Sequence, residues 1–160
     1  MLGFSEGTDV AAVVAASSKG VDRLGFMSGG GPTQAFDFFV MIRKQLRGKD
    51  PAMVEVAITQ LQQKLQDVFT DPTSHTKMLF GHPYSRWAAY FRRPPIESLV
   101  KVSVPIFVAH GSADQSVPIE SADFIAAEFI RLGKKNLTYR RYPGLDHSFY
   151  SCSRRDKDCD

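Results

Sequence analysis

An apolar segment at residues 104–109 constrains the fold of this chain more than any other feature. It holds Val, Ile, Phe and Ala, and only Pro105, near its start, interrupts the pattern. Such a run predicts a strand buried on both faces, as in a parallel sheet. Residues 119–132 then show helical apolar spacing, and residues 136–142 alternate as a strand does. Strand, helix and strand in this order predict an α/β fold with a mostly parallel sheet.

The rest of the chain supplies elements of the same two kinds. Helices are expected at residues 8–18, 34–47 and 51–71. Strands are expected to end at residues 3 and 27. Asp50 is a good helix cap with Pro51 at the first helical position, and the Gly-rich residues 28–32 are a strong strand stop. Residues 73–96 are expected to be irregular, with a short aromatic helix at residues 87–91.

Residues 3–7 read Gly-Phe-Ser-Glu-Gly, which is a G-x-S-x-G pattern. The serine of such a pattern lies on a sharp strand-to-helix turn that is crowded from both sides, so glycine is expected at both flanking positions. Ser5 is therefore the candidate nucleophile, at a helix N-terminus that favours developing negative charge. The backbone N–H of Glu6 is the candidate donor of an oxyanion hole.

A serine hydroxyl becomes a good nucleophile only beside a base that is held by an acid. Asp114 follows the expected strand at residues 104–109, and His147 follows the one at residues 136–142. Loops after successive strands of a parallel sheet gather at one edge. Ser5, Asp114 and His147 are therefore expected to converge, although they lie far apart in sequence.

Neighbouring residues leave alternatives open. Asp146 stands next to His147 and is the rival acid, although adjacent loop residues usually point apart. Asp114 has the alternative of an ordinary turn residue, and His147 that of a surface histidine. His110 ends a strand before a glycine and is expected to be structural.

The three motifs, in this order, resemble the α/β-hydrolase superfamily, in which Ser precedes Asp or Glu and His comes last. The segment VPIFVAHGSADQSVPIESADFIAAEF resembles its acid-bearing strand, turn and helix, and YRRYPGLDHSF resembles its histidine loop. The nearest branches are the dienelactone hydrolases, prolyl oligopeptidases and acyl thioesterases. The resemblance implies a serine hydrolase that cleaves an ester, thioester or peptide bond through an acyl-enzyme, with esterase or thioesterase favoured over peptidase and with no metal or cofactor.

The same resemblance implies a hydrolase domain over residues 1–150, with a helical cap inserted at residues 32–96 and a polar tail at residues 151–160. The insert is rich in aromatic side chains. Candidates to line an acyl or aromatic pocket are Phe36, Phe39, Met41, Trp87 and Tyr90. Packing within the insert's own small core is the alternative for each of them.

Composition argues against several other functions. The formal net charge is +3 and the basic residues are scattered, which argues against a nucleic-acid partner. No apolar run approaches the roughly 20 residues of a membrane span. Cys152 and Cys159 lack the partners of a zinc site, and are either free thiols or a small disulfide loop.

The resemblance also has a gap at its start. Almost nothing precedes Ser5, whereas the superfamily has several strands, and the loop with a second oxyanion-hole N–H, before its nucleophile. The chain is therefore expected to be truncated and impaired, since the loss of one such donor typically costs about 10²–10³ in rate. The alternative function is a non-catalytic remnant that binds a small apolar ligand or a partner chain. Cofactor-free peroxidase chemistry on the same three residues is a third reading.

Overall fold

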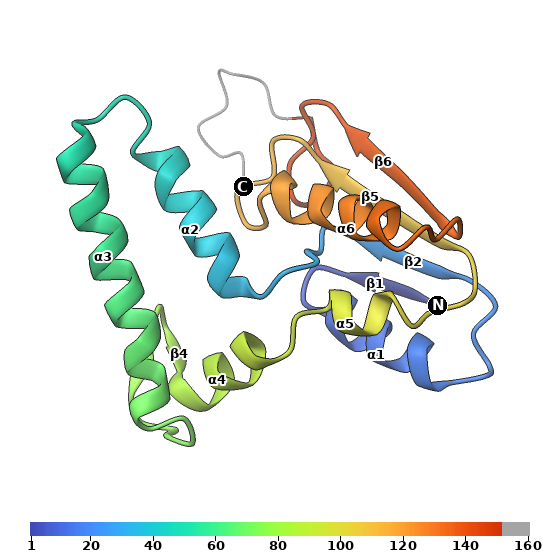
Figure 1. Ribbon diagram of the computed structural model, residues 1–160, viewed down its shortest axis with the longest axis horizontal. Coiled ribbons are helices and arrows are strands. Elements are labelled where there is room, and N and C mark those ends of the chain that lie inside the picture. Colours follow the sequence, from blue (N-terminus) through green and yellow to red (C-terminus); the bar gives the residue numbers. More distant parts are fainter. Residues whose placement is uncertain (152–160) are drawn as a thin grey trace. The chain divides into compact units, whose positions relative to one another are not determined.

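Four parallel strands in the order β1-β2-β5-β6 form the central sheet of the computed structural model (Figure 1). The strands are β1 (Leu2–Phe4), β2 (Leu24–Met27), β5 (Ile106–Gly111) and β6 (Leu137–Tyr142). The α/β fold with a parallel sheet, expected from the sequence, is confirmed. Because all four strands run in one direction, the loops that follow them lie at one edge of the sheet.

The chain divides into two compact units, and the structure describes residues 1–151. Unit 1 joins Met1–Pro32 to the chain from Pro95 onward and contains the sheet, and unit 2 is Thr33–Pro94. The backbone N–H of Ile96 donates to the carbonyl of Gly31 at 3.0 Å, so the two ends of the excursion into unit 2 are tied together within unit 1. Cys152, Cys159 and the expected tail from residue 152 lie outside the described residues.

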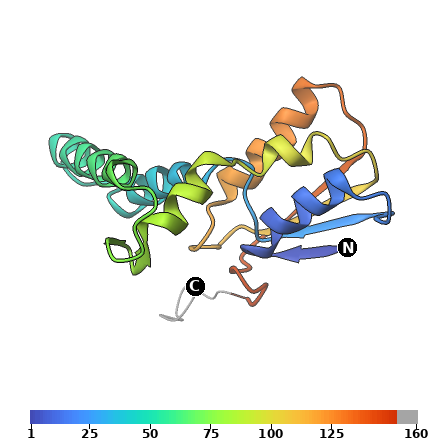
Figure 2. The ribbon, with the colours of Figure 1, turned by 90° about the horizontal axis from the view of Figure 1, so that it is seen from below.

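Three helices of unit 1 lie on the same face of the sheet (Figure 2). They are α1 (Gly7–Ser17), α5 (Ile96–Leu99) and α6 (Ile119–Arg131). Apolar side chains of the strands alternate toward these helices, and the resulting core includes Leu24, Phe26, Ile106, Val108, Ala12, Leu99, Ile125 and Phe129. Every one of these side chains is almost completely buried, so this single layer of packing holds the strand ends in place.

The opposite face of the sheet differs from the sequence expectation. Strand β5 was expected to be buried on both faces, but Phe107, which points away from the helices, is 36% exposed. The parallel register places Leu2 and Gly25 beside it on the same face, and Leu2 is 67% exposed. The expectation is wrong because an apolar run reports the tendency of a strand to be buried and does not specify the layer that buries it.

Unit 2 is mainly helical. Its elements are α2 (Gln34–Gln45), α3 (Pro51–Asp67), the 3₁₀ turn η1 (Val68–Thr70), the hairpin β3 (Met78–Leu79) and β4 (His82–Pro83), and α4 (Tyr84–Arg92). Trp87 is 5% exposed, and its indole N–H donates to the carbonyl of Leu79 at 2.6 Å. The stretch expected to be irregular thus contains a hairpin, whose turn passes through Phe80 and Gly81, both at positive φ.

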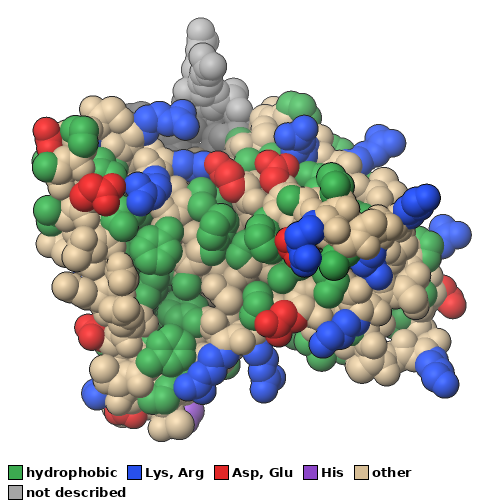
Figure 3. All heavy atoms as spheres, viewed as in Figure 1, with side chains coloured by type: hydrophobic (Ala, Val, Ile, Leu, Met, Phe, Trp, Pro, Cys, Tyr) green, Lys and Arg blue, Asp and Glu red, His purple; other side chains and the backbone are tan. Residues whose placement is uncertain are grey.

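The surface carries charges of both signs. On the face shown in Figure 3, basic and acidic side chains are interspersed, and neither sign forms a continuous field. None of the helices described for residues 1–151 is long and apolar enough to cross a membrane.

The N-cap of helix α3, formed by Asp50, allows the stability of unit 2 to be tested. The Asp50 carboxylate accepts the N–H groups of Ala52 at 2.9 Å and Met53 at 3.2 Å, whereas Thr33, at the start of α2, makes no side-chain cap bond. We expect Asp50→Ala to lower the free energy of unfolding of unit 2 by about 1 kcal/mol. Thr33→Ala is the matched control and should change it by a few tenths at most. Urea unfolding followed by the fluorescence of Trp87, the single tryptophan of the chain, reports on unit 2 alone. Equal losses in both variants would contradict the capping role.

Candidate active site

Ser5 lies on a two-residue turn between the end of β1 and the start of α1. Its φ is 51°, in the left-handed region that side-chain-bearing residues rarely adopt. The surrounding backbone holds this conformation, because the N–H of Ser5 donates to the carbonyl of Met27 at 2.9 Å and its carbonyl accepts from the N–H of Thr8 at 2.9 Å. The turn therefore fixes the hydroxyl at the carboxyl edge of the sheet and at the N-terminus of α1.

The glycines on either side of this turn differ in how closely they are packed. A Cβ at Gly3 would lie 2.8 Å from both the Cβ of Ala11 and the Cα of Thr8, so the strand passes too close to α1 for any side chain. A Cβ at Gly7 would meet nothing within 4 Å. The crowding expected on both sides of Ser5 is thus found at Gly3, and the expectation for Gly7 is wrong within the described residues, because the first turn of α1 is open there.

One imidazole joins the three residues singled out in the sequence. The Nε2 atom of His147 lies 2.9 Å from the Ser5 hydroxyl oxygen, and its Nδ1 atom lies 2.9 Å from Asp114 Oδ2. The His147 side chain is 14% exposed, while that of Asp114 is fully buried. A carboxylate accepts from Nδ1–H, which leaves the Nε2 lone pair directed at the serine hydroxyl. This is the tautomer that a general base for Ser5 requires.

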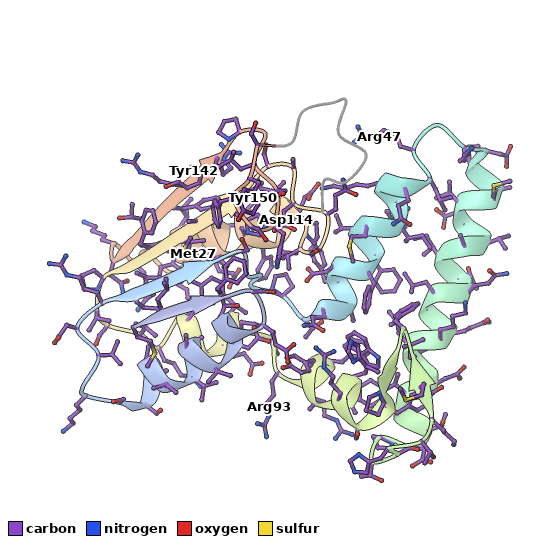
Figure 4. The ribbon with its side chains drawn as sticks, turned by 180° about the vertical axis from the view of Figure 1, so that it is seen from behind. Met27, Arg47, Arg93, Asp114, Tyr142 and Tyr150 are labelled. Atoms are coloured by element: carbon purple, nitrogen blue, oxygen red, sulfur yellow. The ribbon has the colours of Figure 1, made fainter. Side chains whose placement is uncertain are left out.

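The Asp114 carboxylate is held on both of its oxygens. Oδ1 accepts the backbone N–H groups of Ser116 at 2.9 Å and Val117 at 2.8 Å, which leaves Oδ2 to face the imidazole. Figure 4 shows Asp114 at the end of the sheet where the strands terminate. The turn after β5 thus orients the carboxylate as well as carrying it.

Asp146, the rival acid, has a different set of partners. Its Oδ1 accepts the N–H groups of Ser148 at 2.9 Å and Tyr150 at 2.8 Å, and its own N–H donates to the carbonyl of Tyr150. The carboxylate therefore shapes the loop that carries His147, and the imidazole pairs with Asp114 instead.

Two further residues fix this loop, and the sequence patterns did not indicate either of them. The hydroxyl of Ser28, at the end of β2, donates to the carbonyl of His147 at 2.7 Å and is completely buried. A methyl group at Gly111 would overlap the backbone carbonyl oxygens of Leu145 and Asp146, so the loop crosses directly over the end of β5. Both residues lie in segments that looked like simple strand ends, and their contacts depend on tertiary structure alone.

A second imidazole lies behind the acid. His110 is fully buried, and its Nε2 atom lies 2.9 Å from the carbonyl of Val117 and 3.3 Å from Asp114 Oδ2. Burial lowers the pKa of His110 from its ordinary value of 6.5, with the neighbouring hydrogen bond and carboxylate opposing that effect. The side chain expected to be structural thus contacts the carboxylate of the candidate site.

The remaining sequence candidates are distributed over both units. Glu6 precedes the first residue of α1 in unit 1, where its N–H belongs to the helix N-terminus. In unit 2, Phe36 is 39% exposed, Phe39, Met41 and Tyr90 are half-buried, and Trp87 packs with Phe38, Phe80 and Phe91. Trp87 therefore belongs to the core of unit 2.

Within residues 1–151, no three His, Cys, Asp or Glu side chains are grouped so that they could hold a metal ion.

The comparison with known protein families agrees with this fold. The model of the prolyl oligopeptidase family matches residues 52–159, a stretch that includes Asp114 and His147 and begins after Ser5. The match spans more than half of the chain, so this chain belongs to the prolyl oligopeptidase family, whose members are α/β-hydrolases. No curated protein matches the chain in sequence.

Solved structures share the fold at low sequence identity. Est1E from Butyrivibrio proteoclasticus, solved with ferulic acid bound, is 18% identical with a TM-score of 0.56, over 93% of this chain and 51% of that one. The esterase domain of a Rhodothermus marinus protein is 16% identical with a TM-score of 0.53, over 94% and 53%. The acylaminoacyl peptidase of Pyrococcus horikoshii is 11% identical with a TM-score of 0.53, over 91% and 19%. The chain spans about half the length of the two esterases that it matches.

The crossing at Gly111 yields a prediction for the geometry of the site. We expect Gly111→Ala to displace the loop that carries His147, because the added methyl group meets backbone that cannot move independently. Labelling of Ser5 by a fluorophosphonate probe should slow at least tenfold. Gly20→Ala is the matched control, since a Cβ there would meet only the Ser18 hydroxyl, at an ordinary 3.6 Å. Unchanged labelling of the Gly111→Ala protein would show that the loop is not positioned by this contact.

The lowered pKa of His110 yields a second prediction. The unfolded chain takes up a proton on this ring near pH 6.5, whereas the folded chain takes it up only at lower pH. The folded state therefore binds fewer protons in that window, so this ring contributes stability above pH 6.5 that is lost as the pH falls. The loss has an upper limit of about 1.4 kcal/mol per pH unit for one proton.

Urea unfolding followed by far-UV circular dichroism at pH 7 and pH 5 measures this loss. The decrease in stability should be smaller in His110→Gln than in the wild type. His110→Gln removes the titrating ring and keeps an N–H donor near Asp114, so the difference in pH dependence reports the loss of the His110 titration. Identical pH dependence in the two proteins would mean that His110 titrates normally in the folded state.

Proposed function

We propose that this chain carries the nucleophile, base and acid of a serine hydrolase that cleaves an ester, thioester or peptide bond through an acyl-enzyme. The observation that supports it most directly is the continuous hydrogen-bonded path from Ser5 through His147 to Asp114, with both contacts at 2.9 Å. Membership of the prolyl oligopeptidase family gives the proposal its chemical class.

Each residue has one role in the proposed reaction. Ser5 attacks the acyl carbon while the Nε2 atom of His147 takes the hydroxyl proton, and Asp114 orients the ring and stabilises the imidazolium that forms. His147 then returns the proton to the leaving group, and an acyl-enzyme on Ser5 remains. A water molecule, deprotonated by the same imidazole, releases the acid and regenerates the serine.

The start of α1 supplies electrostatic stabilisation in this scheme. The tetrahedral intermediate carries its negative charge on the former carbonyl oxygen, and the backbone N–H of Glu6 is assigned as a donor to it. The partial positive charge of the helix N-terminus acts in the same direction. The carboxylate side chain of Glu6 is exposed, so only its backbone is assigned to the hole.

The substrate proposal favours esters and thioesters over peptides. Est1E holds ferulic acid, an aromatic acid, in its solved structure, so feruloyl esters are a reasonable first test series. Unit 2 is proposed to be the cap, with Phe36, Phe39, Met41 and Tyr90 contacting the acyl group. Trp87 is left out of this set, because its indole is already buried and hydrogen-bonded within unit 2.

Covalent labelling tests the nucleophile directly. We expect a fluorophosphonate probe to modify Ser5, located by peptide mass spectrometry, and Ser5→Ala to abolish labelling. Asp114→Asn should slow labelling by about 10³–10⁴, because the amide cannot hold the imidazole in the required tautomer.

A neighbouring serine supplies the control for this experiment. Ser148 adjoins His147, and Ser148→Ala keeps the backbone N–H that donates to Asp146. It should therefore label at the wild-type rate. Labelling at a residue other than Ser5, or full labelling of Asp114→Asn, would contradict the assignment.

A second function is favoured by one observation. Several apolar side chains on β1 and α1 are exposed: Met1, Leu2, Phe4, Val10 and Val13. A non-catalytic member of the family that binds a small apolar ligand or a partner chain would use such a surface. A folded chain that binds hydrophobic ligands and is not labelled at Ser5 would favour this function over hydrolysis.

A further inference from the structure

Two imidazoles, and not one, contact the carboxylate of Asp114. His147 lies 2.9 Å from Oδ2 on the side of Ser5, and His110 Nε2 lies 3.3 Å from the same oxygen on the side of the core. His110 is the last residue but one of β5 and is completely buried. The proposed hydrolysis uses only the first of these two rings.

The partners of His110 define its tautomer. Both atoms near Nε2, the carbonyl oxygen of Val117 at 2.9 Å and Asp114 Oδ2, can only accept a hydrogen bond in their usual states. The hydrogen of a neutral ring must therefore be on Nε2. It donates to the Val117 carbonyl, and the negative carboxylate oxygen of Asp114 lies 3.3 Å from the same nitrogen.

The other ring nitrogen explains why His110 stays neutral. Its Nδ1 atom is buried and has no hydrogen-bond partner among residues 1–151. A protonated ring would place a second N–H at this position with nothing to accept it, and would bury a charge as well. Burial also lowers the pKa of this ring. His110 is thus held as a donor that takes no part in proton transfer.

The geometry points to His110 as a positioning residue for the proposed hydrolysis. Its neutral ring directs an N–H toward the Asp114 carboxylate, which restrains the carboxylate and weakens its stabilisation of the His147 imidazolium. It contacts neither the hydroxyl nor any reacting atom, so it acts only through the carboxylate. This inference rests on the proposed function for its catalytic consequence, but the contact itself is independent of that function.

The restraint has two separable effects. First, the N–H of His110 and the backbone N–H groups of Ser116 and Val117 fix the carboxylate from three directions, so Oδ2 meets the His147 ring at one angle. Second, a donor shared by Oδ2 withdraws electron density from the oxygen that faces His147. The carboxylate then stabilises the His147 imidazolium less than an unshared carboxylate would.

The second effect predicts a shift that a purely structural role does not. The charged and titratable groups that influence His110 are Asp114, His147 and Asp123. Without the His110 donor, Asp114 holds the imidazolium more strongly. The neutral form of His147 that activates Ser5 should then appear only at higher pH.

The experiment compares full-length variants across pH 5–9. Its readout is the rate of Ser5 labelling by a fluorophosphonate probe. His110→Leu removes the donor, and His110→Gln keeps an N–H at the same number of bonds from Cα as Nε2. Val108→Ala is the control, because Val108 is buried two residues earlier on the same face of β5 and its aliphatic side chain has no hydrogen-bond donor.

We expect His110→Leu to lower the maximal labelling rate about tenfold and to raise the pH of half-maximal labelling by roughly half a unit. His110→Gln should restore the wild-type midpoint, at least in part. Val108→Ala should lose stability with no change in midpoint. A midpoint in His110→Leu that is unchanged or lower overturns the inference, as does an equal shift in Val108→Ala.

A second measurement separates this inference from the proposed function. If the wild-type chain is not labelled at all, the proposed nucleophile fails, and nitrogen-15 NMR of the histidine rings decides the inference alone. The His110 signals should show hydrogen on Nε2 throughout pH 5–9. The titration midpoint of the His147 ring should be higher in His110→Leu than in the wild type. A His110 ring with hydrogen on Nδ1, or a His147 midpoint that does not rise, overturns the inference.

Discussion

The buried carboxylate of Asp114 is the interaction on which the candidate site depends. Its side chain is fully buried, so it requires hydrogen-bond donors to compensate for lost water, and the backbone N–H groups of Ser116 and Val117 supply two of them. The Nδ1 atom of His147 lies 2.9 Å from the other oxygen, and His110 Nε2 lies 3.3 Å from it. The position of the imidazole, and with it the nitrogen that meets Ser5, is thus set by how the turn after β5 satisfies one carboxylate.

Parallel register brings these groups together. Ser5 follows β1, Ser28 follows β2, Asp114 follows β5 and His147 follows β6, so four consecutive positions across the sheet each contribute one contact at the same edge. Ser5 and Ser28 both have φ near the left-handed region, at 51° and 52°. The chain therefore turns sharply at the ends of β1 and β2, and the hydroxyl groups of Ser5 and Ser28 both contact His147.

Much of this arrangement could be predicted from the sequence, because the elements that matter are short and strongly patterned. The apolar run of β5 and the order of Ser5, Asp114 and His147 are local signals, and they led to the correct fold and family. The geometry of the three side chains agrees with the expected pairing, whereas their catalytic roles stay predictions. Ser28 and Gly111 gave no signal, because one forms a hydrogen bond to a residue at position 147 and the other makes room for the same loop. The exposure of Phe107 was missed for a related reason, since no sequence pattern indicates which face of a sheet the helices cover.

The backbone hydrogen bond between Ile96 and Gly31 has a consequence for protein engineering. It fastens the exit and re-entry points of Thr33–Pro94 to each other, so the sheet would be continuous whatever polypeptide connected them. A different module, or a tight turn of a few residues, could be grafted at this junction without altering strand register. The junction is therefore a site at which the inserted unit can be exchanged while the hydrogen-bonded framework around Asp114 stays within unit 1.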